Sequence, residues 1–403
     1  MQSSEPAVIL AARRTPVGKF LGTLARVPAP TLGSYAIRAV LADVPGSAAA
    51  VDECIMGCVL QAGLGQNPVR QAGLKAGLPD TLSAQTVNKV CGSGLQAVML
   101  AAQSIKAGDN QLVLAGGFEN MTAAPHFAKL RDGASNIKFG PATFEDHMQY
   151  DGLRCAFENW AMGNAADHIA KKFEVSRAEQ DRFSVQSHHR AAEATKQGWF
   201  KNEIVALTGE QCLDKKSPGV SADEGIRAES SMDSVGKLKP VFTADGSVTA
   251  ANASQISDGA AALLVSSLAK AEALGVKPIA KIVAYHTAGV APKDIFAAPI
   301  DGIAGVLKKA GLSAKDIDLF EINEAFAAQV LCNLKGLKAA GHEIPESKLN
   351  ICGGGIALGH PIGASGARVL TTLIHQLHRT GGKRGVAALC LGGGNAVAMV
   401  VEV

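Results

Sequence analysis

The sequence predicts an α/β fold made of two similar halves packed as a pseudo-dimer, with a long inserted loop domain. The chain has 403 residues, which is too long for one compact core, since single cores stop growing beyond about 250–300 residues. Short apolar runs that favour β-strands alternate with amphipathic runs that favour helices. The same order of runs appears in each half of the chain, so we expect two similar units.

The first half begins with a strand and continues in alternation. Its runs predict a strand at 7–12, a helix at 31–41, a strand at 53–60, a helix after Cys91 and a strand at 111–117. In the helix after Cys91, the apolar residues Leu95, Val98, Met99 and Ala102 are spaced to lie on one face. We therefore expect this helix to pack on a sheet through that face.

The second half repeats this order. Its runs predict a strand at 278–289, a helix at 303–310, a strand at 318–326, a helix after the turn 359–366 and a strand at 385–394. The clearest repeat pairs 91–117 with 363–394. Each has a turn of small residues, an amphipathic helix, a polar turn and a buried strand. We expect the two turns to converge between the halves, where helix N-termini then lie close together.

A different kind of region separates the halves. Residues 121–250 are more polar, contain both tryptophans and include a charged helical stretch at 175–198, in which Ser176 and Glu179 have capping-box spacing. An insertion of this length favours a functional cover over a linker. The predicted domains are thus 1–120 plus 251–276, the inserted loop domain 121–250 that binds the bulk of a substrate, and 277–403.

Composition limits the classes of function. The net charge of +3 is small for this length and indicates neither nucleic-acid nor membrane binding. No cleavable signal and no apolar run of membrane-spanning length are visible, so we expect a cytoplasmic protein. The eight cysteines are scattered, which favours free thiols. Cys54 and Cys58 have no second pair at zinc spacing, so no metal site is expected.

Cys91 stands directly before a turn of small residues that opens a helix. The positive end of the helix dipole and the free N–H groups there favour a thiolate. A free cysteine is nevertheless more often a small buried hydrophobe, so the surrounding chemistry has to decide. Three other segments, 323–327, 353–366 and 390–395, contain polar side chains and a second thiol that could take part in a reaction with Cys91. The glycine-rich segment around His360 has neither dinucleotide-fingerprint nor phosphate-loop spacing.

Together these segments carry a resemblance to a known family. The stretches "AARRTPVGKF", "QNPVRQA", "VCGSGLQA", "AGGFENM", "NEAFA" and "GHPIGASGAR" resemble the thiolases, and the resemblance covers essentially the whole chain. The pattern "DGLRCAF" followed by Met162 and Gly163 resembles the acetoacetyl-CoA branch of that family. The resemblance implies a thiolase-like fold and the reversible condensation of two acetyl-CoA molecules by ping-pong acyl transfer.

The resemblance also implies catalytic roles. Cys91 is expected to be the nucleophile, and His360 to take its proton and lower the pKa of the thiol toward neutrality. Cys390 is expected to be the general acid and base. The N–H of Gly392, with that of Cys91, is expected to bind the oxyanion of the acyl-enzyme. Asn323 is expected to hold a water that joins His360 in stabilising an enolate.

Coenzyme A implies a tunnel and a partly basic outer surface. By resemblance the contacting residues are Arg227 and Ser234 at the nucleotide, Phe242 beside it, Ala253, Ser254, Leu153 and Met162 at the pantetheine, and Phe326 as a pocket aromatic. The expected partners are acetyl-CoA, acetoacetyl-CoA and coenzyme A, all substrates, with no further cofactor. We expect a homodimer or homotetramer, whose subunits contact each other through the first and second halves or through the tip of the insertion around 127–140.

Two departures from the family pattern keep alternatives open. Ala161 stands where the acetoacetyl-CoA branch usually has a histidine, and Asn395 and Ala396 replace the usual residues after the last glycine-rich turn. A smaller residue at 161 leaves open a degradative 3-ketoacyl-CoA thiolase with longer substrates. A catalytically silent thiolase-like CoA- or lipid-binding protein is the other alternative, although it has no use for two thiols. A β-ketoacyl synthase is disfavoured, because it needs no second cysteine.

Overall fold

The computed structural model describes residues 5–130, 139 and 141–403. Its strands are β1 (Ala7–Arg14), β2 (Gly18–Lys19), β3 (Glu53–Gly57), β4 (Ser83–Val87), β5 (Leu112–Asn120), β6 (His126–Phe127), β7 (Glu145–Asp146), β8 (Ser257–Ser267), β9 (Ala280–Gly289), β10 (Leu319–Ile322), β11 (Arg384–Leu391) and β12 (Asn395–Glu402). Its α-helices are α1 (Ala29–Asp43), α2 (Pro68–Ala76), α3 (Ser93–Ala107), α4 (Met162–Lys172), α5 (Arg177–Lys196), α6 (Met232–Gly236), α7 (Leu268–Ala273), α8 (Ala298–Ala310), α9 (Ala327–Ala339), α10 (Gly355–Leu358) and α11 (Ser365–Thr380).

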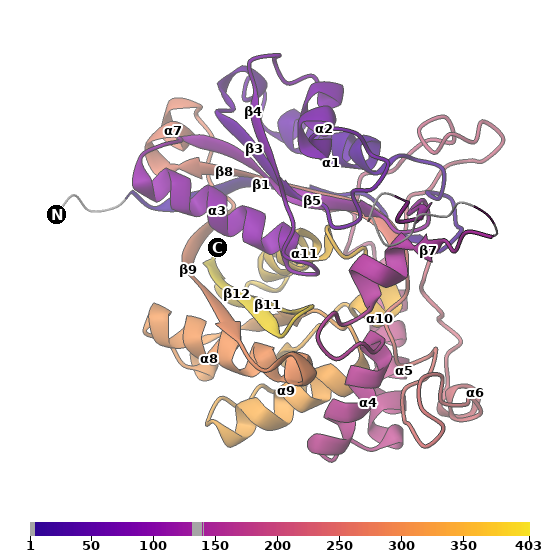
Figure 1. Cartoon of the computed structure of the whole chain (residues 1–403). Helices are drawn as coiled ribbons and strands as arrows, with labels where there is room; N and C mark the ends of the chain where they lie inside the picture. The colour runs from indigo at the N-terminus through magenta and orange to yellow at the C-terminus, as the bar shows by residue number, and fades with distance from the viewer. Residues whose placement is uncertain (1–4, 131–138, 140) are drawn as a thin grey trace.

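A ten-stranded sheet passes through both halves of the chain. Its order is β10-β11-β12-β9-β1-β8-β5-β3-β4, with β2 paired to β8, while β6 and β7 form a separate pair. Among the described residues, the two parts of the sheet join through two residue pairs between β1 and β9, Val8 with Lys281 and Ile9 with Ala280. The sheet is therefore continuous in hydrogen bonding but is divided into two parts, each with its own helices (Figure 1).

Helices cover both parts of the sheet and fill the space between them. In Figure 1, α1 and α2 lie on the outside of the first half, α8 and α9 lie on the outside of the second, and α3 and α11 lie between the two parts of the sheet. The predicted α/β fold of two similar halves is confirmed. Each half contributes one buried central helix, and each of these helices begins at one of the small-residue turns predicted to converge.

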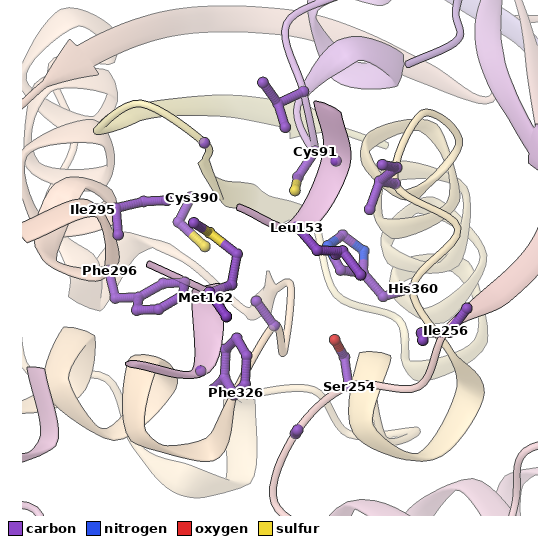
Figure 2. A pocket seen from close by; sticks show the side chains of 18 of the residues that line it. Cys91, Leu153, Met162, Ser254, Ile256, Ile295, Phe296, Phe326, His360 and Cys390 are labelled. Carbon is purple, nitrogen blue, oxygen red and sulfur yellow. The ribbon is translucent and has the colours of Figure 1, made fainter. Parts of the chain in front are cut away.

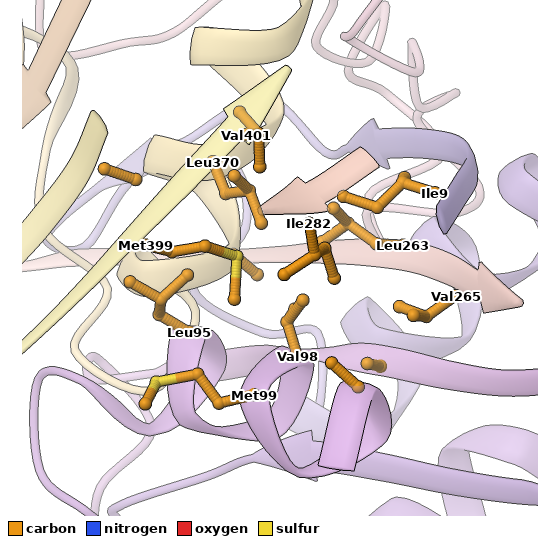
Figure 3. Packing of buried hydrophobic residues seen from close by; sticks show 14 of the residues in the cluster. Ile9, Leu95, Val98, Met99, Leu263, Val265, Ile282, Leu370, Met399 and Val401 are labelled. Carbon is orange, nitrogen blue, oxygen red and sulfur yellow. The ribbon is translucent and has the colours of Figure 1, made fainter. Parts of the chain in front are cut away.

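The apolar stripe of α3 forms the centre of the largest core cluster. Figure 3 shows Leu95, Val98 and Met99 facing strands of both halves, with Ile9 and Met399 among their neighbours. The predicted stripe is confirmed. Further alanines of α3 are also buried, because the helix is enclosed by both halves rather than lying on one sheet.

The insertion packs against the second half. Helices α4 and α5 both contact α9, and α5 also contacts α10. The predicted capping box opens α5: the Ser176 hydroxyl accepts a bond from the Glu179 N–H, and a Glu179 carboxylate oxygen accepts one from the Ser176 N–H. The exact division into domains stays a prediction. Residues 131–138 and 140 of the predicted contact segment 127–140 lie outside the described residues.

Some predicted boundaries differ from the structure. The strand predicted at 318–326 ends at Ile322, where the chain turns toward α9. The helix predicted at 303–310 begins at Ala298, because Pro299 fits the first helical turn, where no N–H bond is needed. No prediction was made for β8, a central strand that is buried along its whole length between β1 and β5. Within the described part of the chain, no helix combines the length and apolar character needed to span a membrane.

Candidate active site

A cavity of about 200 Å³ lies where the two halves and the insertion meet. The predicted site residues that line it are Cys91, Leu153, Met162, Phe242, Ala253, Ser254, Phe326, His360, Cys390 and Gly392. Figure 2 shows the side chains of Cys91, Cys390 and His360 pointing into this space from different segments. The structure thus brings both thiols and the imidazole to one cavity.

A tight turn before α3 positions Cys91. Val90 has a positive φ of 46°, a conformation that a β-branched residue rarely adopts and that recurs at functional sites. Gly92 has no side chain, and a Cβ there would lie 2.4 Å from Leu391 Cδ2 at the end of β11. The glycine therefore allows the turn of the first half to approach the strand that carries Cys390.

The thiol of Cys91 is protonated in this arrangement. Burial among protein atoms raises its pKa to about 12, and the Glu119 carboxylate adds to the rise. Hydrogen bonds from the N–H groups of Gly392 and of Cys91 itself act in the opposite direction, because they favour the thiolate. The prediction that the pKa of this thiol falls toward neutrality is wrong, since the effect of desolvation on the pKa outweighs that of the two donors. The two predicted oxyanion donors do converge on the sulfur.

Cys390 lies at the end of β11 and is buried. Burial raises the pKa of this thiol well above its usual value, and the nearby Cys91 raises it further. The turn that follows contains Gly393 and Gly394, both with positive φ, and leads into β12. Cys390 and Cys91 therefore reach the cavity from opposite halves, and both are neutral there.

His360 is held as a neutral imidazole. Burial lowers its pKa to about 3, with a smaller contribution from the positive charge of Arg368. Its Nδ1 lies 2.6 Å from the Ser365 hydroxyl, and the Asn323 amide nitrogen lies 3.4 Å from both ring nitrogens. Among the described residues, these are the side chains with which the ring forms hydrogen bonds, and Cys91 is not one of them.

Asn323 lies behind His360 rather than in the cavity wall. It directly follows β10, where its N–H donates to the Ala388 carbonyl of β11, and it is completely buried. Its side-chain oxygen has no hydrogen-bond partner among the described residues. A buried amide oxygen left unpaired is costly, so this atom is suited to bind a water or a substrate group.

The part of the cavity around Cys390 is apolar. Phe326 packs edge-to-face against Phe296, with ring centroids 5.3 Å apart, and Ile295 lies beside them. The sequence did not single out Ile295 or Phe296, because nothing distinguished them from core residues. Ala161 lines the same cavity at the N-terminus of α4, so its small side chain contributes directly to the free volume.

Two predicted nucleotide contacts do not line the cavity. Arg227 and Ser234 are both exposed on the insertion. The backbone N–H of Arg227 donates to His188 Nδ1, and the Ser234 hydroxyl donates to the Ser231 carbonyl in the first turn of α6. Their role in binding a nucleotide stays a prediction. Phe242, predicted to lie nearby, lines the cavity itself.

Glu119 at the end of β5 is a site-supporting residue that the sequence did not reveal. One carboxylate oxygen accepts from the N–H of Leu60 and the thiol of Cys58, and the other accepts from the N–H groups of Val59 and Gly363. The carboxylate therefore ties the loop that carries His360 to the first half. Burial raises its pKa to about 7, against the effect of these donors.

Across residues 5–130, 139 and 141–403, no three His, Cys, Asp or Glu side chains gather closely enough to hold a metal ion.

Comparisons with known proteins agree with this geometry. Residues 7–269 match the family description "Thiolase, N-terminal domain", and residues 276–403 match "Thiolase, C-terminal domain". An acetyl-CoA acetyltransferase of Chromobacterium violaceum is 49% identical over 98% of both chains. A cytosolic acetyl-CoA acetyltransferase of Rattus norvegicus is 47% identical over 99% of this chain and 98% of its own. The crystal structure of the Bacillus anthracis acetyl-CoA acetyltransferase superimposes with a TM-score of 0.93 and 38% identity, covering all of both chains.

Proposed function

Because this chain belongs to the thiolase family, we propose that it is an acetyl-CoA C-acetyltransferase, which joins two acetyl-CoA molecules into acetoacetyl-CoA and free coenzyme A. The observation that carries the proposal is the meeting of two thiols, that of the half-buried Cys91 and that of the buried Cys390, with a neutral imidazole in one cavity. One thiol can hold an acyl group while the other moves a proton, so the site contains the groups that both half-reactions need.

In the first half-reaction Cys91 becomes acetylated. His360 Nε2 takes the thiol proton, and the thiolate attacks the carbonyl carbon of acetyl-CoA. The carbonyl oxygen becomes an oxyanion, for which the N–H groups of Cys91 and Gly392 are the proposed donors. The C–S bond to coenzyme A then breaks, and the leaving thiolate takes the proton of Cys390, which becomes a thiolate, while His360 keeps the proton of Cys91. The products are acetyl-Cys91 and free coenzyme A.

In the second half-reaction a carbon–carbon bond forms. Cys390, as the thiolate, removes a proton from the methyl group of a second acetyl-CoA. The resulting enolate is stabilised by His360 and by a water held on Asn323. Its carbon attacks the acetyl carbonyl on Cys91, and the bond to Cys91 breaks. The departing Cys91 thiolate takes its proton back from His360, and Cys390 keeps the methyl proton, so all three groups are neutral again. The product is acetoacetyl-CoA, and reversal of these steps is thiolysis.

The pKa values of the thiols fit this sequence of steps. Both thiols start the cycle neutral, since desolvation raises their pKa values. The thiols then lose their protons only when a thioester binds. This limits oxidation, because thiolates are oxidised more readily than thiols. We propose that the reaction uses no cofactor beyond coenzyme A and its esters.

Substrate binding is proposed to follow the cavity outward. Leu153, Met162, Ala253 and Ser254 line it and are the proposed pantetheine contacts. Arg227 and Ser234, exposed on the insertion, are the proposed contacts of the nucleotide outside the cavity. We further propose a cytoplasmic homodimer or homotetramer. The names of the rat and mouse relatives, which are called cytosolic, support this location.

The test is thiolysis of acetoacetyl-CoA by free coenzyme A, followed by the loss of the enolate absorbance of the ketoacyl ester. We expect turnover with acetoacetyl-CoA and formation of acetyl-CoA. The apolar lining by Ile295 and Phe296, with Ala161 beside it, favours a second candidate that also cleaves longer 3-ketoacyl-CoA esters. A series of chain lengths separates the two. No turnover with any ketoacyl-CoA would indicate the silent binding protein instead.

A further inference from the structure

The hydroxyl of Ser365 lies between the Pro361 carbonyl and the ring of His360. The Ser365 Oγ lies 2.8 Å from the Pro361 carbonyl oxygen and 2.6 Å from His360 Nδ1. A hydroxyl has one proton to donate. Two oxygens 2.8 Å apart repel each other unless a proton lies between them, and a carbonyl has none to give. The hydroxyl proton therefore points to Pro361, and Ser365 Oγ is left as an acceptor toward the ring.

The remaining neighbours of the ring agree with a neutral imidazole held by this bond. Asn323 presents its amide nitrogen from the end of β10, at the same distance from both ring nitrogens, so it selects neither tautomer. Arg368, on the same helix as Ser365, places a positive charge nearby. The backbone N–H of His360 is held separately by Gln255 and Ser257. Ser365 is thus the neighbour that distinguishes the two ring nitrogens.

We propose that Ser365 is a positioning residue that keeps the proton of His360 on Nδ1, so that Nε2 presents a lone pair as the base for Cys91. The inference rests on the proposed function, in which His360 takes the Cys91 proton. A neutral imidazole has one donor and one acceptor nitrogen, and the partner of one decides the role of the other. When Nε2 accepts the thiol proton, the Nδ1–H to Ser365 bond remains and supports the imidazolium.

The substitution Ser365→Ala removes the acceptor with little other change. The Pro361 carbonyl keeps its bonds from the N–H groups of Ala364 and Ser365, both 2.9 Å. A matched control exists in α5: Ser184 is also completely buried and also donates to the carbonyl four residues earlier, that of Gln180. Within the described part of the chain, Ser184 makes no hydrogen bond to a histidine, so Ser184→Ala tests the loss of a buried hydroxyl alone.

The direct readout is the ¹⁵N NMR signal of the His360 ring in the full-length protein, assigned by its disappearance in His360→Gln. We expect a protonated Nδ1 and an unprotonated Nε2 in the unsubstituted protein, and a shift toward the other tautomer in Ser365→Ala. Acetylation of Cys91 by acetyl-CoA should slow on the order of 10- to 100-fold in Ser365→Ala, with KM nearly unchanged, as for other groups that orient a functional histidine. Ser184→Ala should keep both the signal and the rate.

The outcomes separate the inference from the proposed function. A protonated Nε2 in the unsubstituted protein overturns the inference whatever the variants do. An equal loss of rate in Ser184→Ala and Ser365→Ala, or an unchanged tautomer in Ser365→Ala, overturns it as well. Absence of acetylation in the unsubstituted protein contradicts the proposed function, while the tautomer measurement still decides the role of Ser365.

Discussion

The two thiols differ in the groups that surround them. Cys91 receives hydrogen bonds from its own N–H and from that of Gly392, which favour its thiolate. Cys390 is fully enclosed, packs with the apolar cluster around Phe296 and Phe326, and has the less favourable surroundings for a charge. This asymmetry supports the proposed roles, in which Cys91 is the nucleophile and Cys390 the proton shuttle.

Substitution of the nucleophile is the first prediction. Cys91→Ser should form no stable acetyl adduct with acetyl-CoA, because a serine hydroxyl is far less acidic than a thiol in the same site. Mass spectrometry of the protein after brief exposure to acetyl-CoA measures this. Cys212→Ser, at a buried thiol away from the cavity, is the control and should be acetylated normally. A stoichiometric adduct on Cys91→Ser would contradict the assignment.

Substitution of the shuttle is the second prediction. Cys390→Ser should still acquire an acetyl group on Cys91 but should condense it with a second acetyl-CoA at least 10²- to 10⁴-fold more slowly, the usual contribution of a general acid or base. The two steps are measured separately, by mass spectrometry and by acetoacetyl-CoA formation. If condensation stays near the normal rate, Cys390 is a packing residue.

At the scale of elements, a loop of the second half inserts into the first. The loop that carries His360 passes so close to β5 that a Cβ on Gly117 would lie 2.0 Å from the Gly363 carbonyl oxygen. Glu119, two residues further along β5, fastens the loop through the Gly363 N–H. The position of His360 relative to Cys91 therefore depends on contacts between other residues, those of Gly117 and Glu119 with Gly363.

The third prediction concerns this anchor. Each carboxylate oxygen of Glu119 accepts two hydrogen bonds. Glu119→Gln replaces one of these oxygens with an NH₂ group, which cannot accept, so donors of the protein are left without a partner. We expect the free energy of unfolding to fall by about 1–3 kcal/mol, the penalty for an unpaired buried group. Urea denaturation measures it, with exposed Glu343→Gln as the control. Equal stability of the two variants would show that the anchor is dispensable.

The N-terminus of α4 carries the fourth prediction. Ala161→His fills space in the cavity, so the variant should cleave 3-ketohexanoyl-CoA less well relative to acetoacetyl-CoA than the unsubstituted protein does. Small differences in a hydrophobic pocket are worth about 1–3 kcal/mol in specificity. The ratio of kcat/KM values for the two esters measures the effect. Identical ratios would place residue 161 outside the path of the acyl chain.

At the scale of the whole molecule, packing two halves against each other buries ionisable groups between them. His360 is held neutral with a pKa of about 3, while Glu119 and Asp258 have pKa values raised to about 7 and about 6, in each case mainly by burial. These groups make stability depend on pH, because the folded and unfolded chains bind protons over different ranges.

The fifth prediction follows from His360. Its folded-state pKa lies below its ordinary value of about 6.5. As the pH falls below 6.5, the unfolded chain binds a proton that the folded protein does not, so stability present above pH 6.5 is lost on acidification. The carboxyl groups with raised pKa values affect stability in the opposite direction. A variant at His360 retains them, so their effect cancels when the variant is compared with the unsubstituted protein. Between pH 6.5 and pH 5, His360→Asn should lose about 1–2 kcal/mol less stability than the unsubstituted protein. Urea denaturation at both pH values checks this, and equal losses would contradict it.

Features that depend on neighbouring residues could be predicted from the sequence. The alternation of runs predicted the α/β halves, the Ser176–Glu179 spacing predicted a helix start, and the small residues after Cys91 predicted its place before α3. Most of the site residues that the resemblance in the motifs implied line the cavity. Periodicity, capping and turn formation act within a few residues, so a single sequence contains what is needed to predict them.

Tertiary packing decided the rest. The pKa of Cys91 depends on desolvation by segments that reach it from both halves, and for that reason the expected fall became a rise. Nothing near Glu119 in the sequence indicates its role, because its donors Val59 and Gly363 come from distant parts of the chain. Ser365 lies only five residues from His360, yet its effect on the ring depends on the direction of one hydroxyl proton. Burial, charge and hydrogen-bond direction are properties of the three-dimensional neighbourhood, and only the folded chain creates that neighbourhood.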